Sequence, residues 1–572
     1  MTRTPVAATL LLMFAVPSHA ADRPNVVLLI TDDQGYGDIG AHGNTMLKTP
    51  TLDRLHGQSV RLTDFHVDPT CSPTRSALMT GRYSTRTGVW HTIAGRSLMD
   101  PGEITLAEVF AANGYATGQF GKWHLGDNYP LRPQDQGFAR TLHHRGGGIT
   151  QSPDFWGNDY FDDTYWGEDG APHPATGYCT DVWFAAAQEF IREHRDGPFL
   201  CYVATNAPHS PYFVAESYRQ PYLAAGVSEP MASFYGMIAN FDENLARLLA
   251  TLDELQIADN TLLIYMTDNG SAAGWAPNGP AGAWTGFNAG MRDRKASEYD
   301  GGHRVPFFVR WPTGGIGGGR DEDLLAAHID VLPTLVELCG LTSPPHRAWD
   351  GVSLASVLRG DDGGPSARTL FVHSQRLERP EKWRKCAVLT EQWRLVNGVE
   401  LYDVVPDRGQ KTDVASSHPD VVSTLRSAYD RWWESLEPVF DDEVRIGLGH
   451  ASANPTLLCC HDWHGEPIPV NQDTVAKDPA QNGYWSVDVR EAGRYEFRLR
   501  SRPPGTIQPI DATTATLRLG DVERTIAVPS GADEAVVSVD LTAGPAHLAT
   551  EISGGSRPAR GAYYVEVRRV SE

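Results

Sequence analysis

A cysteine and an arginine lie four residues apart, as Cys71 and Arg75, in the segment D-P-T-C-S-P-T-R-S-A-L-M-T-G-R-Y. Pro73 suits the first turn of a helix, where its missing N–H would have no intrahelical acceptor in any case. Gly81 suits the position just after a helix end. The pattern therefore predicts a helix that begins at Cys71. Its N-terminus would favour an anionic oxygen next to this side chain, because free N–H groups and the helix dipole point there.

Several ordinary roles compete for Cys71. A disulfide or a buried thiol is a common role for cysteine in an exported protein. A thiol phosphatase would need arginine at the sixth position after the cysteine, where this chain has Ala77. A metal thiolate is poorly supported, because no second cysteine or histidine lies at ligand spacing.

Pairs of oxygen-bearing side chains follow two apolar segments. Asp32 and Asp33 follow the run N-V-V-L-L-I, and Asp268 and Asn269 follow the run T-L-L-I-Y-M-T. Such runs are typical of strands buried on both faces, and open α/β sheets place their ligands at the carboxyl ends of these strands. Oxygen ligands alone favour calcium or magnesium over zinc. Taken by itself, D-D-Q-G would be read as a solvated turn.

Basic side chains follow further predicted strands. Lys122 and His124 flank a tryptophan just after the predicted strand Tyr115–Phe120, and His209 follows the run F-L-C-Y-V-A. Lys295 lies ahead of the segment D-G-G-H-R-V-P. A lone histidine at a strand end is more often structural, whereas a lysine beside His124 favours a functional edge of the sheet.

The run C-S-P-T-R, extended as S-A-L-M-T-G-R, resembles the signature of the formylglycine-dependent (type I) sulfatases of the alkaline phosphatase superfamily. The resemblance covers roughly Asn25–Glu437. It implies that Cys71 is oxidised to an aldehyde by a maturation enzyme, and that the aldehyde hydrate attacks the sulfur of a sulfate ester. It also implies one divalent cation, Ca²⁺ or alternatively Mg²⁺. The positions that match the family's metal ligands are Asp32, Asp33, Cys71, Asp268 and Asn269.

The resemblance also assigns roles to the basic residues. Arg75 matches the residue that holds the formylglycine and a metal-ligand carboxylate. Lys122 and His209 match groups that contact the sulfate oxygens, and Lys295 matches a second sulfate-binding lysine that can assist the leaving group. His124 matches the histidine beside the aldehyde hydrate, whose deprotonation expels sulfate and regenerates the aldehyde.

Other functions remain as alternatives. A two-zinc phosphatase would have Asp-His in place of Asp268-Asn269 and Ser or Thr in place of Cys71. A phosphonate or phosphodiester hydrolase that uses the same aldehyde is a closer alternative, as is an aryl sulfatase of small substrates. A non-enzymatic glycan-binding protein would need a broken core site, and no matched position is missing. Asp300 is one departure, because the family usually has glutamate there, and its supporting role is open.

The arrangement of elements predicts an α/β fold. Alternating strands and helices imply a mixed, mostly parallel sheet with helices on both faces. Four short strands and a helix then predict a small antiparallel subdomain. After a linker near Glu437–Pro467, six segments with period-two alternation are typical of a β-sandwich, whose function is not readable from the sequence. We predict a catalytic domain over 22–367, the small subdomain over 368–440 and the sandwich over 445–572.

The net charge excludes some functional classes, and the N-terminal segment predicts where the protein is located. The chain has 572 residues and a formal net charge of −22, which argues against nucleic acid as a partner. Residues 1–20 predict a secretory signal peptide, and no other segment predicts a membrane span. We therefore expect a periplasmic or extracellular protein. Six cysteines remain if Cys71 is modified, and fifteen pairings are possible, so none is assigned. The oligomeric state is not predicted.

The expected substrate is a sulfated carbohydrate, with exo and endo action both open. An exported chain meets polymers outside the cytoplasm, and an appended sandwich is common in glycan-active enzymes, although that point is an analogy. Aromatic and polar side chains between the motifs could stack on sugar rings. They are Trp90, His91, Trp156, Tyr160 and Trp284. The alternative is that these side chains pack loops.

Overall fold

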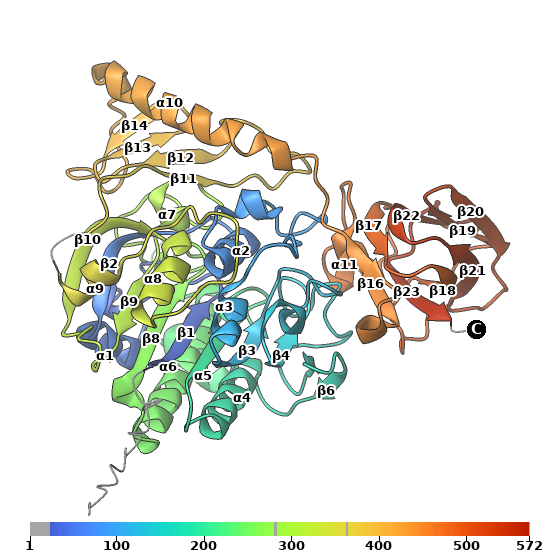
Figure 1. Cartoon of the computed structure of the whole chain (residues 1–572), viewed down its shortest axis with the longest axis horizontal. Coiled ribbons are helices and arrows are strands. Elements are labelled where there is room, and N and C mark those ends of the chain that lie inside the picture. The colour runs from blue at the N-terminus through green and yellow to red at the C-terminus, as the bar shows by residue number, and fades with distance from the viewer. Residues whose placement is uncertain (1–22, 279–282, 362–363, 571–572) are drawn as a thin grey trace, which may run out of the picture.

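Three groups of β-strands organise the chain (Figure 1). The computed structural model describes residues 23–278, 283–361 and 364–570, so the predicted signal peptide lies outside the described residues. The strands fall into a ten-stranded sheet, a four-stranded sheet, and a pair of five- and four-stranded sheets. The predicted domain limits remain predictions.

The largest sheet carries the predicted strand ends. Its order is β10-β2-β9-β8-β1-β7-β3-β4-β5-β6. The bounds are β1 Asn25–Thr31, β2 Val60–His66, β3 Ala116–Lys122, β4 Arg140–His144, β5 Thr164–Gly167, β6 Pro172–Pro174, β7 Phe199–Ala204, β8 Thr261–Thr267, β9 Phe307–Arg310 and β10 Arg320–Ala327. The central strands β8, β1, β7, β3 and β4 are parallel, whereas β9, β5 and β6 pair antiparallel to their neighbours. The predicted mixed, mostly parallel sheet is confirmed.

Helices cover both faces of this sheet. The bounds are α1 Pro50–Gln58, α2 Cys71–Thr80, α3 Leu106–Ala112, α4 Cys179–Glu193, α5 Glu216–Ala224, α6 Met231–Glu254, α7 Asp300–His303, α8 Val331–Leu338 and α9 Ala355–Arg359. Val26 and Leu28 of β1 face a core shared with α2, α3 and α8, whereas Val27 and Leu29 face one shared with α1, α4 and α6. This alternation explains why the whole strand is apolar.

The small sheet packs on the main body through one face. Its strands are β11 Leu370–His373, β12 Cys386–Leu389, β13 Trp393–Val396 and β14 Glu400–Asp403, all antiparallel. Ala387 and Leu389 face the core that contains Ala77 of α2. Val388 faces α10, Pro419–Glu434, on the outer side (Figure 1). The small sheet therefore supports the helix that begins at Cys71.

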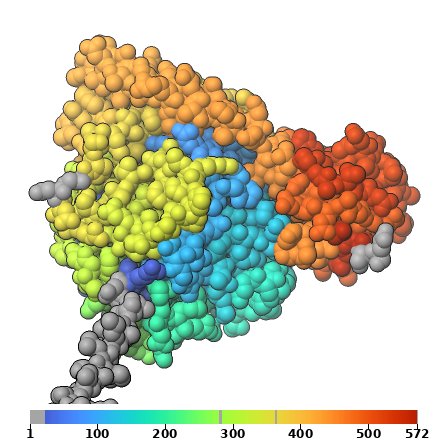
Figure 2. All heavy atoms as spheres, viewed as in Figure 1, coloured from blue at the N-terminus to red at the C-terminus, as the bar shows by residue number. Residues whose placement is uncertain are grey.

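The C-terminal sandwich consists of two sheets, ordered β15-β17-β22-β19-β20 and β16-β23-β18-β21. Its elements are β15 Ile446–Leu448, β16 Thr456–Cys459, α11 Gln472–Ala476, β17 Tyr484–Val489, β18 Gly493–Arg500, β19 Thr514–Leu519, β20 Val522–Ala527, β21 Ala535–Leu541, β22 Gly544–Ser553 and β23 Tyr564–Val570. The predicted linker is wrong in part, because β15 and β16 lie inside it. They are too short to show a periodic pattern. Figure 2 shows the sandwich as a lobe that projects from the rest of the molecule.

The cysteine side chains form no disulfide among the described residues. All seven cysteines lie in the described ranges, and each is buried with a free thiol. Cys459 and Cys460 are adjacent in the chain and unpaired.

Within residues 23–278, 283–361 and 364–570, no helix has both the length and the apolar character needed to cross a bilayer.

Candidate active site

Two neighbouring strand ends bring four predicted metal ligands together. Strands β1 and β8 are parallel neighbours, and Thr31 lies opposite Thr267, so the residues that follow them meet at one edge. The backbone N–H of Asp33 donates to Asp268 Oδ1 at 3.0 Å. The Asn269 amide donates to Asp33 Oδ1 at 2.9 Å. The structure therefore places the D-D and D-N motifs side by side, as the sequence predicted.

Cys71 is the first residue of α2, at the N-terminal end of that helix. Its side chain is buried, with 3% exposure, and its Sγ lies 3.4 Å from Nδ1 of His124. The helix ends at Gly81, whose φ of 68° requires the left-handed conformation that glycine adopts without strain. The helix dipole at Cys71 favours the development of negative charge on an oxygen at this position.

His124 is held with one ring nitrogen directed at Cys71. Its Nε2 lies 2.9 Å from the carbonyl oxygen of Thr92, which requires a proton on Nε2. In the neutral ring Nδ1 is then an acceptor facing residue 71. Burial, together with the charge of Lys122, lowers the pKa of His124 well below its ordinary value, which favours this neutral form. The arrangement suits a base that removes a proton from a group on residue 71.

Arg75 and Lys122 fix the carboxylates of the site. Nε and Nη2 of Arg75 both donate to Asp268 Oδ2, at 3.2 and 2.9 Å, and Nη1 donates to the Lys122 carbonyl at 3.1 Å. Nζ of Lys122 donates to Asp32 Oδ2 at 2.6 Å. These four side chains are buried, so each charge depends on its partner.

Lys295 and His209 approach Asp33 from the more open side. Lys295 Nζ forms a very short contact with Asp33 Oδ1, and His209 Nε2 lies 3.8 Å from Asp33 Oδ2. Nδ1 of His209 donates to the Ser210 carbonyl at 2.6 Å, and burial lowers its pKa to about 3. His209 can donate to a sulfate oxygen only after Nε2 takes up a proton. The negative charge of an anionic ligand would stabilise the protonated His209 ring.

The oxygen ligands fit a hard divalent cation. Asp32 Oδ1 and Asn269 Oδ1 are buried and have no hydrogen-bond partner among the described residues. One ligand atom each from Asp32, Cys71 and Asp268 lie within 4.8 Å of one another. Burial, and then the charge of Asp268, raise the pKa of Asp32 well above its ordinary value. Two buried oxygens that lack donors, next to further carboxylates, are an environment that suits Ca²⁺ or Mg²⁺.

A glycine loop that the sequence analysis did not single out contacts both histidines. A Cβ at Gly147 would lie 2.4 Å from Cε1 of His124, and a Cβ at Gly148 would lie 3.2 Å from Nδ1 of His209. The loop is R-G-G-G-I-T-Q, and its three successive glycines are the signal that could have identified it. Only a backbone without side chains passes this close to the two rings.

The sandwich also reaches the site, through His461. Its ring centroid lies 6.2 Å from that of His124, and the side chain is buried. Its Nδ1 lies 3.3 Å from Asp462 Oδ1. His461 lies in the segment predicted as a linker, where no pattern in the sequence pointed to a contact with the active site.

The aromatic side chains proposed to stack on sugars divide into two groups. Trp90, His91 and Tyr160 are buried, so the expectation that they could stack on sugar rings is wrong for these three. Tyr160 instead donates its hydroxyl hydrogen to the His209 carbonyl at 3.1 Å, which supports the loop that carries His209. Trp156 and Trp284 are half-buried. Trp156 and His209 both line a cleft of about 770 Å³.

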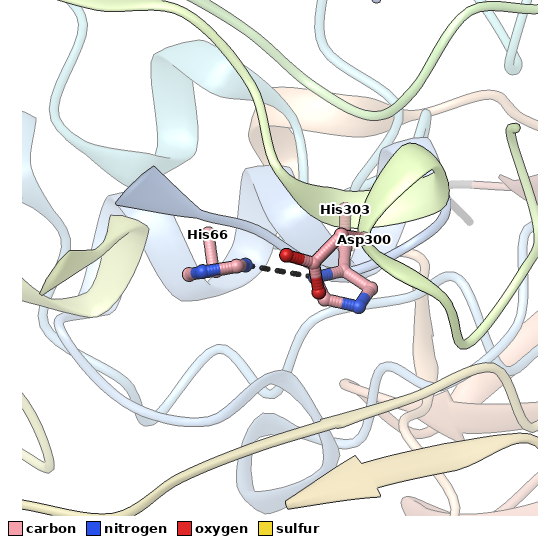
Figure 3. Close-up of side chains that lie close together, drawn as sticks. All are labelled: His66, Asp300 and His303. Atoms are coloured by element: carbon pink, nitrogen blue, oxygen red, sulfur yellow. Dashed lines mark hydrogen bonds between the residues drawn. The ribbon is translucent and has the colours of Figure 1, made fainter. Parts of the chain in front are cut away.

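Asp300, the departure from the family pattern, belongs to a second buried cluster (Figure 3). His66 Nδ1 lies 2.9 Å from His303 Nδ1, so one of these nitrogens donates to the other. His66 Nε2 lies 3.0 Å from Asp64 Oδ1. Arg394 of β13 donates to Asp64 at 2.9 Å and to Asp300 at 3.2 Å. This buried network joins the small sheet to β2 and α7, which supports the segment leading to Cys71.

Replacing Arg394 by methionine should destabilise the protein strongly. The substitution removes the buried guanidinium that pairs with both Asp64 and Asp300, and such a loss costs about 3–5 kcal/mol. Urea unfolding followed by tryptophan fluorescence measures the change. The control is Arg408→Met, because Arg408 pairs with Asp323 at 3.7 Å across exposed side chains, where a pair contributes about 0–1 kcal/mol. Equal losses in the two variants would contradict the assignment.

Comparison with known proteins agrees with this geometry. Residues 24–341 match the family model described as Sulfatase. The chain is 31% identical to human arylsulfatase A over 515 residues, which cover 79% of this chain and 96% of that protein. It is 31% identical to human N-acetylgalactosamine-6-sulfatase over 60% of this chain and 67% of that protein. The structure of Ps i-CgsB in complex with k-i-k-neocarrahexaose is similar at 26% identity, with a TM-score of 0.62, and covers 72% of this chain and 92% of that chain.

Proposed function

The chain belongs to the sulfatase family and is a sulfuric ester hydrolase, and from this premise we propose that it acts on sulfated carbohydrates outside the cytoplasm. We further propose that Cys71 is converted to formylglycine by a maturation enzyme and that the cation is Ca²⁺. The observation that carries the proposal is the position of Cys71, 3.4 Å from the acceptor nitrogen of His124. The convergent oxygen ligands lie beside it.

Two groups absent from the unmodified chain supply part of the chemistry. A cation held by Asp32, Asp33, Asp268 and Asn269 would neutralise charge on the sulfate, and formylglycine at position 71 would supply the nucleophile. The side chains described above would supply the rest of the chemistry. Lys122, Lys295 and His209 surround the two aspartates and would donate to sulfate oxygens as negative charge develops there, and one such donor is worth roughly 2.7–4 kcal/mol.

His124 would act as the base in the proposed mechanism. The acceptor nitrogen Nδ1 of His124 would take a proton from the group on residue 71. Loss of that proton would expel the bound sulfate and restore the resting state.

Three cationic side chains, Lys122, Lys295 and Arg75, already offset the three carboxylates of the site. A divalent cation therefore leaves positive charge that an anionic ester can offset, although the whole chain carries −22.

The carbohydrate class rests on two kinds of support. One relative is named N-acetylgalactosamine-6-sulfatase, and one structural neighbour is in complex with k-i-k-neocarrahexaose. The cleft of about 770 Å³ beside His209 exceeds the needs of a small aryl ester and is lined partly by the sandwich, through Asn471 and Gln472. Remote contacts in such a cleft accelerate hydrolysis only for substrates large enough to make them.

The test is a substrate screen with protein whose Cys71 conversion has been verified by mass spectrometry. We expect defined sulfated saccharides to exceed 4-nitrophenyl sulfate in kcat/KM by at least about tenfold, because about 1.4 kcal/mol of additional transition-state binding suffices. Bis(4-nitrophenyl) phosphate serves as the control for phosphodiester hydrolysis. Efficient turnover of 4-nitrophenyl sulfate with no activity on any sulfated mono-, oligo- or polysaccharide would overturn the carbohydrate proposal.

A further inference from the structure

A second cavity, of about 300 Å³, lies between the catalytic body and the sandwich. The body contributes the segment from Pro153 to Trp156 and the side chains of Asp127, Arg145 and Trp166. The sandwich contributes Asp462, Tyr564 and the loop from Pro503 to Thr506. Neither part alone would enclose this space. In Figure 1 the sandwich lies against the blue and cyan loops of the catalytic body.

Hydrogen bonds hold the two parts together around the cavity. The Tyr564 hydroxyl donates to the Ser152 carbonyl at 2.8 Å, and the Ser152 N–H donates to the Val470 carbonyl at 2.8 Å. The Gln472 amide donates to the Asp154 carbonyl at 3.3 Å and to the Phe155 carbonyl at 3.1 Å. The sandwich thus fixes the loop that carries the aromatic wall.

The lining combines aromatic faces with an unpaired guanidinium. Arg145 lies 4.4 Å above the ring of Trp166, and its Nε is buried without a hydrogen-bond partner. Across the described ranges, no ion pair or side-chain hydrogen bond of this guanidinium is found. Phe155 remains 38% exposed beside Trp166, with ring centroids 6.0 Å apart. Buried polar groups normally have partners, so an Arg145 donor without one points to a ligand.

This cavity adjoins the reaction centre. Trp156 lines both this cavity and the cleft that contains His209. Arg145 begins the glycine loop that passes between His124 and His209. Asp462 follows His461, whose ring lies 6.2 Å from that of His124. Trp156 is therefore a wall that the two spaces share, so a sugar in the second cavity would lie next to one bound at His209.

We propose that this cavity is a subsite for an unsulfated, hydroxyl-bearing sugar residue next to the residue whose sulfate is cleaved. The inference rests on the proposed function, since it assumes a saccharide substrate. The aromatic faces suit the apolar side of a sugar ring, and convergent polar groups suit its hydroxyls. Arg145 can donate to a hydroxyl, while Asp127 and Asp462 can accept from one.

The charges of the lining decide between a neutral and an anionic residue. Three carboxyl groups, of Asp127, Asp154 and Asp462, line the cavity with one guanidinium, that of Arg145. The carboxyl oxygens of Asp154 already accept from Thr150 at 3.1 Å and from Asn158 at 3.1 Å. Burial raises the pKa of Asp127 to about 6 and that of Asp154 well above its ordinary value. A second sulfate or a uronate would either lie against these carboxylates or force their protonation, with a single guanidinium to offset its charge, whereas a neutral sugar carries no such cost, so the subsite selects a neutral sugar.

Binding measured apart from catalysis tests the subsite. Saturation-transfer NMR with the full-length Cys71→Ala protein would use lactose, N-acetyllactosamine and cellobiose as neutral probes. We expect transfer to at least one of them, and its loss in Thr506→Trp, which fills the cavity from the sandwich side. Phe155→Ala should weaken the signal, whereas Phe161→Ala should not. Phe161 has the same exposure of 38% but does not line the cavity.

Kinetics with the modified enzyme provide the second readout. For a sulfated disaccharide with a neutral neighbour, Phe155→Ala should lower kcat/KM by about 10-fold to 100-fold, in the range of a central binding contact. Hydrolysis of 4-nitrophenyl sulfate should stay within about twofold, because this ester does not reach the cavity. No transfer to any of the three sugars, transfer unaffected by Thr506→Trp, or stronger binding of a uronate disaccharide would each overturn the subsite. Failure of the sulfatase proposal itself would appear as inactivity on every sulfate ester, whatever the binding result.

Discussion

Replacing Cys71 by alanine will abolish sulfate-ester hydrolysis while the fold remains intact. The Cys71 Sγ lies beside the His124 ring and beside the ligands Asp32 and Asp268, whereas the neighbouring Ser72 hydroxyl donates to the His124 carbonyl and so cannot take over this role. Loss of a nucleophile of this kind lowers kcat by roughly a millionfold in the best-studied hydrolases. The Sγ makes only a 3.4 Å contact with His124, so the smaller side chain should cost little stability. Rates on the best substrate, with melting temperature as the check on folding, measure both effects.

The matched control for this experiment is Cys339→Ala. Cys339 is also buried with a free thiol, but it lies in the core beside α8 rather than at the site. Its removal should leave activity within about twofold of the parent, because it contacts none of the site residues. Peptide mass spectrometry of the parent protein should find formylglycine at position 71. Fully active protein with an unmodified Cys71 thiol would contradict the proposed chemistry.

Strand-end motifs were the part of the site that the sequence predicted well. A strand buried on both faces is apolar throughout, so both strands can be identified from the sequence. Parallel neighbours end at the same edge of the sheet. The D-D motif after β1 and the D-N motif after β8 therefore lie together once these strands pair. Cys71 was similarly accessible, because proline and glycine mark the two ends of a short helix. In each of these cases a local pattern was enough to place the residue.

Contacts between distant segments were not accessible in this way. His461 reaches His124 because the sandwich docks on the body, and no local pattern encodes that docking. The pairing of Asp300 with Arg394 joins residues 94 positions apart. Strand β22, Gly544–Ser553, is not one of the six segments predicted from alternation, because Leu548 and Ile552 are its only large apolar residues. Tertiary packing determines all three features.

Exposure was the least predictable property. Trp90 and Tyr160 lie in loops rich in glycine and polar residues, which suggested solvent-facing aromatic rings. In the structure both rings are buried. The Trp90 indole donates to the Leu377 carbonyl at 3.0 Å, and Tyr160 supports the His209 loop. Long loops in a large protein can form satellite cores of their own, so composition alone did not distinguish a binding surface from loop packing.

Substitution of Asp268 will separate the metal-binding role of this residue from its structural one. Asp268→Asn should lose the tightly bound divalent cation and about 10²-fold to 10³-fold in activity, the range of one lost electrostatic contact in a transition state. Asp268→Ala should show the same functional loss and a further fall in stability of about 3–5 kcal/mol, because the buried Arg75 guanidinium would lose its carboxylate partner. Asparagine keeps an oxygen for the Arg75 guanidinium, so its structural cost is smaller. Metal analysis of desalted protein and urea unfolding measure the two effects.

The control is Asp196→Ala, which removes a carboxylate whose side chain is 93% exposed and should change neither metal content nor activity. Parent protein should carry about one divalent cation per chain, because the unpartnered oxygens of Asp32 and Asn269 lie beside Asp33 and Asp268 in one site. Chelation should remove the cation and lower activity together, and restoring Ca²⁺ or Mg²⁺ in separate samples identifies the native ion. Full activity with a stoichiometric cation in Asp268→Ala would show that the ligands lie elsewhere. Equal stability of the alanine and asparagine variants would show that Arg75 does not depend on this carboxylate.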